Sequence, residues 1–184
     1  MFAVKVGRNV ELDDPLASSN GKNPDIIFNY ANQRIAIACK TLRGTSINTL
    51  LDNLRTAAKQ INRAKCDRGY IAINAMNILP HEKISNNVYL TLLEPFNILN
   101  SYIENLYGAI QHEAAKELDE IFTSKKVSPV ILTFVHSTTR LSSLLGNVPT
   151  TIKSTFASPL RDIPEKQFDM KLLNQINEFI HQRI

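Results

Sequence analysis

The chain has 184 residues, of which 43% are hydrophobic and 21% charged, a composition that suits one soluble globular domain with a sizeable core. It has no internal repeat, no biased tract and no run of about 18 apolar residues, which argues against solenoid, disordered and membrane-spanning proteins. A formal net charge of +4 permits binding to a polyanion but does not demonstrate it.

The first half of the chain predicts a hairpin followed by a βαβ unit. The segment MFAVKVG is strand-like, and residues 13 to 24 form a polar loop. Residues 25–31 and 33–42 are β-branched, apolar runs around Asn32 and predict two hairpin strands. Thr45 or Ser46 then caps a helix of about five turns that begins at Ile47. Residues 70–79 predict a strand that lies parallel to the second hairpin strand.

The second half predicts helices and two further strands. Residues 84–123 have a helical pattern that Pro95 should kink or split. Strands are expected at 128–138 and, more weakly, at 151–158. A closing helix should begin at Asp162 and bury one face. The inward positions expected in the two helical regions are Leu90, Leu93, Tyr102, Leu106, Ile110 and Ile121, then Phe168, Leu172, Ile176 and Ile180.

One group of residues in the first half of the chain has the pattern of a candidate active site. Asp25 follows Pro24 at the start of one hairpin strand, and Ala38, Cys39 and Lys40 end the other. Because strand residues two apart point to the same face, residue 38 and Lys40 should project together toward Asp25, with Cys39 pointing into the core. With the following helix, this pattern resembles the PD-(D/E)xK nuclease superfamily over residues 1 to about 80.

The resemblance implies a fold, a reaction and a site. The fold is an α/β class with a mixed central β-sheet flanked by helices, a restriction-endonuclease-like core at about 1–80 and additions at 81–184 within a single domain, 1–184. The reaction is Mg²⁺-dependent hydrolysis of phosphodiester bonds in DNA. By resemblance, Asp25 and the Cys39 carbonyl would bind the metal and Lys40 would position the attacking water. Ala38 stands where the family has an acid, so weak Mg²⁺ binding and little cleavage are expected.

Three explanations for Ala38 stay open. The domain can be a degenerate member that binds nucleic acid without cutting it, a carboxylate can have migrated, with Glu11 as the nearest candidate, or the alanine can be an inactivating substitution. The family core also commonly begins with a helix, whereas this sequence opens on a strand-like segment.

A second pattern concerns DNA contact. Arg55, Lys59 and Arg63 recur every four residues and form a basic stripe on the helix, which is either a solvated face or a track for a phosphate backbone. Gln60 occupies a position that some family members place near DNA; otherwise it is a surface residue. A homodimer is a further expectation, as is an alternative in which residues 84–123 pair with another chain and the domain has no catalytic role.

Other classes of site lack support in the sequence. His81, His112, His136 and His181 have no metal-pair spacing, and Cys39 and Cys66 have no zinc or CxxC spacing, so no disulfide or zinc site is expected. No Walker A, G-x-S-x-G or G-x-G-x-x-G motif occurs. Residues 136–143, HSTTRLSS, can grip a phosphate through Arg140 or form an ordinary loop. The first residues lack the features of a secretory signal, and a cytoplasmic location is expected.

Overall fold

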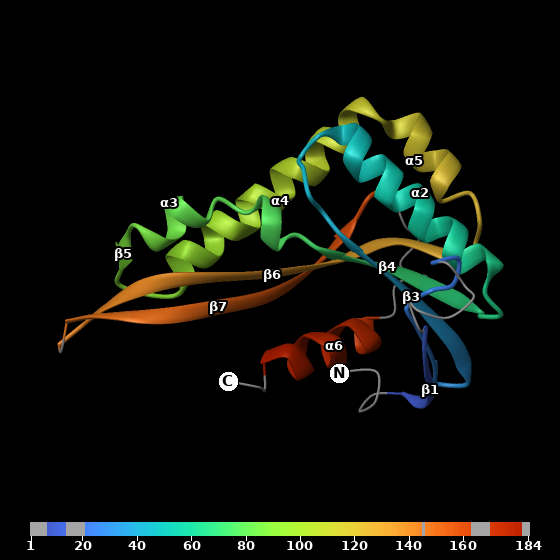
Figure 1. The fold of residues 1–184 in the computed structure, drawn as a ribbon, viewed down its shortest axis with the longest axis horizontal. Helices are drawn as coiled ribbons and strands as arrows, with labels where there is room; N and C mark the ends of the chain where they lie inside the picture. The colour runs from blue at the N-terminus through green and yellow to red at the C-terminus, as the bar shows by residue number, and fades with distance from the viewer. Residues whose placement is uncertain (1–6, 14–20, 145, 163–169, 182–184) are drawn as a thin grey trace.

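A seven-stranded mixed β-sheet forms the centre of the protein and has helices on both faces (Figure 1). The computed structural model describes residues 7–13, 21–144, 146–162 and 170–181. The strands lie in the order β1-β2-β3-β4-β6-β5, and β7 pairs with β6. The elements are β1 (Arg8–Leu12), β2 (Ile26–Tyr30), β3 (Gln33–Thr41), α2 (Ile47–Arg63), β4 (Arg68–Asn74), a 3-10 turn (Met76–Ile78), α3 (His81–Ser85), β5 (Val88–Tyr89), α4 (Leu93–Glu113), α5 (Ala115–Ile121), β6 (Val127–Ser143), β7 (Gly146–Pro159) and α6 (Met170–His181).

The predicted hairpin is confirmed as β2 and β3. These strands pair antiparallel from Ile26 opposite Ile37 to Tyr30 opposite Gln33. Ala31 and Asn32 make the connection, both with positive φ (46° and 63°), as the tightest right-twisted hairpin turns require. This short turn fixes the register of the two strands that carry Asp25, Ala38 and Lys40.

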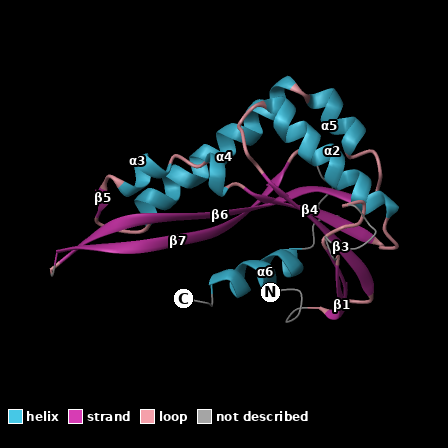
Figure 2. Cartoon of the chain, viewed as in Figure 1, coloured by secondary structure: helices cyan, strands magenta, loops and turns pink. Residues whose placement is uncertain are grey.

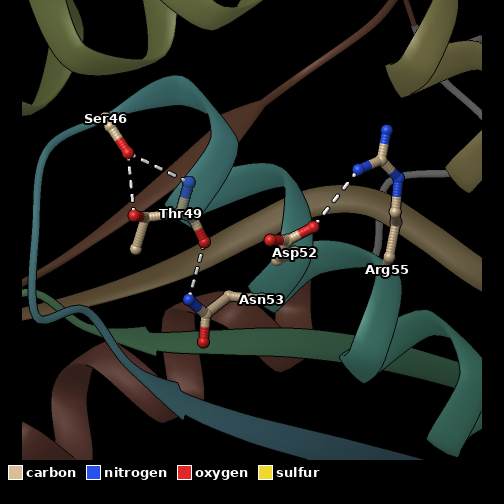
Figure 3. Close-up of polar contacts among 5 residues, drawn as sticks. All are labelled: Ser46, Thr49, Asp52, Asn53 and Arg55. Atoms are coloured by element: carbon tan, nitrogen blue, oxygen red, sulfur yellow. Dashed lines mark hydrogen bonds and ion pairs between the residues drawn. The ribbon is translucent and has the colours of Figure 1, made fainter.

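The predicted βαβ unit is also confirmed. Ser46 caps α2, and its hydroxyl oxygen accepts the Thr49 N–H at 3.2 Å (Figure 3). β4 lies parallel to β3. The helix packs closely on β4 at Gly69. A Cβ atom added at this glycine would lie only 2.2 Å from Cγ2 of Ile61 on α2. Glycine at this position is what allows the close approach.

Two apolar clusters hold the layers together, one on each face of the sheet. Figure 2 shows α2, α4 and α5 on one side of the sheet and α6 on the other. The larger cluster joins the sheet to α2, α4 and α5, and contains Ala36 and Ala38 from β3. The smaller cluster joins the opposite face to α6, and contains Ile35 and Ile37 from β3. The alternation along β3 therefore assigns residue 38 to the α2 face. The predicted α/β class with a mixed sheet between helices is confirmed.

Two predicted element boundaries are wrong. The strand expected at 70–79 ends at Asn74, because the Asn74 side chain accepts the Met76 N–H at 3.0 Å and turns the chain into the 3-10 turn. The helix expected at 84–123 is instead α3, β5, α4 and α5. Pro95 lies in the first turn of α4, where its missing N–H costs little, and the break falls at Ala114, which leaves the helical region of φ and ψ.

The burial predictions for that region are correct only in part. Ile110 and Ile121 are buried and Tyr102 and Leu106 are half-buried, but Leu90 and Leu93 are 80% and 64% exposed. Both leucines lie in or next to the connection between β5 and α4, where the helical period does not apply.

Residues 136–143 are part of β6 and do not form the expected loop. β6 continues to Ser143, which pairs with Gly146 at the start of β7. The strand expected at 151–158 is likewise longer, and the two strands form a hairpin that runs along α4 and α3 and whose tip extends beyond them at one end of the molecule (Figure 1). Ser137 and Thr139 are buried and contact α3, whereas Thr138 and Arg140 are exposed, which is the alternation expected of a strand with one covered face.

The remaining predictions concern the two ends of the chain. In α6, Leu172 and Ile176 are buried as predicted. The expected start of that helix around Pro164 and Phe168 lies outside the described residues, as do the side chain of Ile180 and residues 1–6 of the strand-like opening segment. Among the described helices, none combines the length and apolarity that a membrane crossing demands.

Candidate functional site

Asp25 and Ala38 lie opposite each other on β2 and β3. Ile26 pairs with Ile37, so the next positions outward, 25 and 38, face each other across the two strands. Cross-strand partners project to the same face of a sheet. Ile27 and Ala38 both pack on the α2 cluster, which places Asp25 on this face as well.

Lys40 shares the same face. It lies two residues after Ala38, and Leu42, two residues further on, again belongs to the α2 cluster. Lys40 is half-buried. The alternation argument made from the sequence therefore holds in the fold, since Asp25, residue 38 and Lys40 project from one face at one end of β2 and β3.

The Asp25 carboxylate is bound to the backbone of the neighbouring strand. Its Oδ2 atom accepts the Cys39 N–H at 2.7 Å, a short, charge-assisted hydrogen bond. This bond ties the start of β2 to the end of β3. A carboxylate has about four acceptor positions, so Asp25 retains capacity for a further ligand.

Cys39 faces the opposite side of the sheet but does not enter the core as expected. The residue is exposed and is not a member of the apolar cluster on that face. Partial desolvation of the sulfur and, second, the negative charge of Asp25 raise the pKa of the Cys39 thiol to about 11, while the positive charge of Lys40 acts in the lowering direction. The thiol is therefore neutral at pH 7.

Ala38 is fully buried in the α2 cluster. A longer side chain at this position must displace its neighbours or extend toward the end of the strand where Asp25 and Lys40 lie. No local pattern indicates this packing. Because of it, residue 38 is not an open position beside a metal.

Glu11, the sequence-based candidate to replace the carboxylate missing at position 38, does not reach the site in this structure. Both carboxylate oxygens of Glu11 accept Nη2 of Arg34, at 2.9 and 2.7 Å, and this ion pair holds Glu11 toward the other end of β3. Asp13 lies closer to the site. Its N–H donates to the Asp25 carbonyl oxygen at 3.0 Å, and its Oδ1 accepts the Asn23 side-chain amide at 3.2 Å.

Asp13 was missed because its position depends on the pairing of β1 with β2. Leu12 pairs with Ile26, so residue 13 stands opposite Asp25 and on the same face. Within the described ranges, no group of three or more His, Cys, Asp or Glu side chains could hold a metal ion. Asp13 and Asp25 are thus a pair of neighbouring carboxylates and not a complete site.

The basic stripe on α2 is divided. Arg55 is half-buried and donates to Asp52 at 3.3 Å (Figure 3), whereas Lys59 and Arg63 are exposed. α2 returns from the end of β3 that carries Lys40, and Arg63 is its last residue. The stripe therefore leads away from Asp25 and Lys40.

Gln60 is buried and not on the surface, with 5% of its area exposed. Its Nε2 donates to the Gly21 carbonyl oxygen at 2.8 Å, and its Oε1 has no hydrogen-bond partner among the described residues. The side chain thus joins α2 to the loop that leads to Asp25, a structural task that sequence periodicity did not indicate.

No family model matches the chain, and no curated protein or solved structure does either.

Proposed function

We propose that this chain is a nuclease-like domain with a restriction-endonuclease-like core that acts on DNA through a divalent metal, with its activity weakened by Ala38. The observation that carries the proposal is the placement of Asp25, residue 38 and Lys40 on one face at the end of β2 and β3. Three antiparallel strands, a helix and a strand parallel to the last of them surround these residues, and this hairpin, helix and strand order supports the proposal.

In this proposal Asp25 is the principal metal ligand, with the Cys39 carbonyl beside it, and Asp13 contributes the second carboxylate. Mg²⁺ takes oxygen ligands and keeps several waters, so a pair of carboxylates suffices for a weak site. The metal would neutralise the phosphate and lower the pKa of a bound water, and the Lys40 ammonium would position that water or stabilise charge on the phosphate.

The test restores the missing carboxylate. Ala38→Glu places a carboxylate beside Asp25, and Ala38→Gln is the matched control with the same size and no charge. Both variants overpack a buried position and should lose about 1–3 kcal/mol of stability. Mg²⁺ should raise the melting temperature of the Glu variant more than that of the Gln variant, because only the former gains a ligand.

Cleavage of plasmid and oligonucleotide DNA with Mg²⁺ or Mn²⁺ then reports activity. We expect Ala38→Glu to cut faster than the parent chain, and Lys40→Ala or Asp25→Asn in that background to remove the gain. Asp13→Asn should weaken Mg²⁺ binding in the parent chain. A folded Ala38→Glu variant that neither binds Mg²⁺ nor cuts DNA would refute the nuclease assignment.

A second candidate function is non-catalytic binding of DNA through the same domain. The complete burial of Ala38 in the α2 cluster argues against an open metal position there, and the exposed Lys59 and Arg63 offer cations for a phosphate backbone. Affinity for duplex DNA should then fall with salt, with a log-log slope of about 0.9 for each phosphate neutralised. Lys59→Ala and Arg63→Ala should each lower that slope by about one if the stripe contacts the phosphate backbone of DNA. If neither substitution changes the affinity or the slope, the stripe is not the DNA-binding surface.

A further inference from the structure

A small pocket lies at the end of the sheet opposite to Asp25 and Lys40. It has a volume of about 230 Å³ and is lined by the start of β4, the connection from α5 to β6, and the residues after β7. Ile35 pairs with Arg68 and Lys40 with Ile73, so five residues along β4 separate the two ends. At about 3.3 Å per residue the pocket is roughly 17 Å from the candidate metal site.

The charged lining of this pocket is predominantly basic. Arg68, Lys125 and Arg161 contribute three positive charges, and Asp162 contributes the one negative charge among the described lining residues. The three cations come from separate segments of the chain and meet only in the fold. A concave surface with this balance attracts an anion.

Arg161 is held in place at the pocket. Its Nη1 donates to the Phe122 carbonyl oxygen at 3.1 Å and lies 3.9 Å from Oδ1 of Asp119. The guanidinium carries five N–H donors, so this anchoring leaves others for a ligand. The remaining fork of N–H groups matches the spacing of phosphate oxygens.

Two serine hydroxyls add neutral donors. Oγ of Ser124 accepts the Lys126 N–H, and Oγ of Ser128 accepts the Val130 N–H, each at 3.3 Å. Both serines line the pocket. Because each oxygen already accepts a backbone N–H, its own hydroxyl hydrogen is oriented away from that bond and can donate to an anion.

We propose that this pocket binds the dianion of a phosphate monoester. Three cations and two hydroxyl donors around a small cavity suit a compact, doubly charged group with three terminal oxygens. The volume corresponds to about eight waters at about 30 Å³ each, enough for a phosphate and a few attached atoms. Such a group can come from a free small phosphate or from the terminal phosphate of a nucleic-acid strand.

The experiment follows amide chemical shifts of the full chain during titration with inorganic phosphate at constant ionic strength. We expect saturable shifts for residues 123–128, and at least ten-fold weaker binding in Lys125→Ala and Arg161→Gln. Lys116→Ala, an exposed lysine on α5 outside the pocket, is the matched control and should bind as the parent chain does. The amide spectrum of each variant shows whether it is folded, and Lys125 is exposed, so its truncation should not disturb the fold.

Parallel titrations with a nucleoside monophosphate and with oligonucleotides bearing a 5′-phosphate or a 5′-hydroxyl distinguish the two sources. Tighter binding of the 5′-phosphorylated strand identifies a strand end, and equal binding of all monoesters identifies a free phosphate. Non-saturating shifts, or shifts that persist in the Lys125→Ala, Arg161→Gln double variant, would overturn the proposal. Asp25→Asn should leave phosphate binding unchanged, so this test is independent of the nuclease assignment.

Discussion

The thiol of Cys39 is a chemical reporter of the candidate site. Its pKa is raised to about 11, with desolvation as the larger cause and the charge of Asp25 as the second, whereas Lys40 acts to lower it. At pH 9 roughly one thiol in a hundred is then ionised. The chain has two cysteines, so a Cys66→Ala background leaves Cys39 as the single thiol.

Removing either charge should change the rate of reaction with a chromogenic disulfide in opposite directions. Asp25→Asn should lower the Cys39 pKa, and Lys40→Ala should raise it. A fall of one pKa unit increases the thiolate fraction about ten-fold, but the weaker nucleophilicity of the more acidic thiolate reduces the net gain to roughly three- to four-fold. Asn at position 25 keeps an oxygen that can accept the Cys39 N–H, so the fold should be preserved.

The same assay detects a metal without requiring cleavage. Mg²⁺ bound at Asp25 would neutralise its charge and accelerate the thiol reaction in the parent chain, but not in Asp25→Asn. Rates measured from pH 7 to 10 compare the thiolate fractions of the variants, because below the pKa the thiolate fraction rises about ten-fold per pH unit. If Asp25→Asn and Lys40→Ala change the rate in the same direction, or leave it unchanged, then the two groups do not flank Cys39 and the site geometry is wrong.

Three further predictions concern stability. Gly69→Ala should cost about 1–3 kcal/mol in urea unfolding, because the new methyl group meets Ile61, and Ile61→Ala in the same chain should make the added methyl group nearly neutral. Stability should fall as pH rises through about 9 to 11, because the thiol of Cys39 and the buried phenol of Tyr107 both have raised pKa values and ionise more readily in the unfolded chain; thermal unfolding of Tyr107→Phe should show a weaker fall. Ser46→Ala should lower stability by about 1 kcal/mol through loss of the α2 cap, measured by the same urea unfolding.

Local signals in the sequence were enough to predict the first hairpin and α2. The turn at Asn32 and the cap at Ser46 depend on a few adjacent residues. The prediction failed for residues 84–123 because one apolar period was extended across several breaks, so Leu90 and Leu93 were assigned to the core. The spacing of apolar residues alone does not show where a helix ends and a connection begins.

Only the part of the candidate site that depends on alternation along one strand could be predicted from the sequence. Two-residue alternation placed residue 38 and Lys40 on one face, but Asp13 depends on pairing between β1 and β2, which no local pattern specifies. The burial of Ala38 and Gln60 depends on how α2 packs on the sheet. The basic pocket joins Arg68, Lys125 and Arg161 from distant segments and had no sequence signal at all.

Asp25 and Lys40 do not support the nuclease proposal equally, because they make different contacts in the structure. Asp25 accepts the Cys39 N–H and so serves the β2–β3 pairing whether or not a metal binds; its presence alone does not require catalysis. The backbone of Lys40 pairs with β4, but its ammonium forms no hydrogen bond or ion pair with another described residue, although the residue is half-buried at the end of a strand. Burying part of a lysine beside a carboxylate, with no described structural bond in return, fits a group that acts on a ligand. The nuclease proposal therefore depends more on Lys40 than on Asp25, and the behaviour of Lys40→Ala in the thiol and cleavage assays weighs most in deciding it.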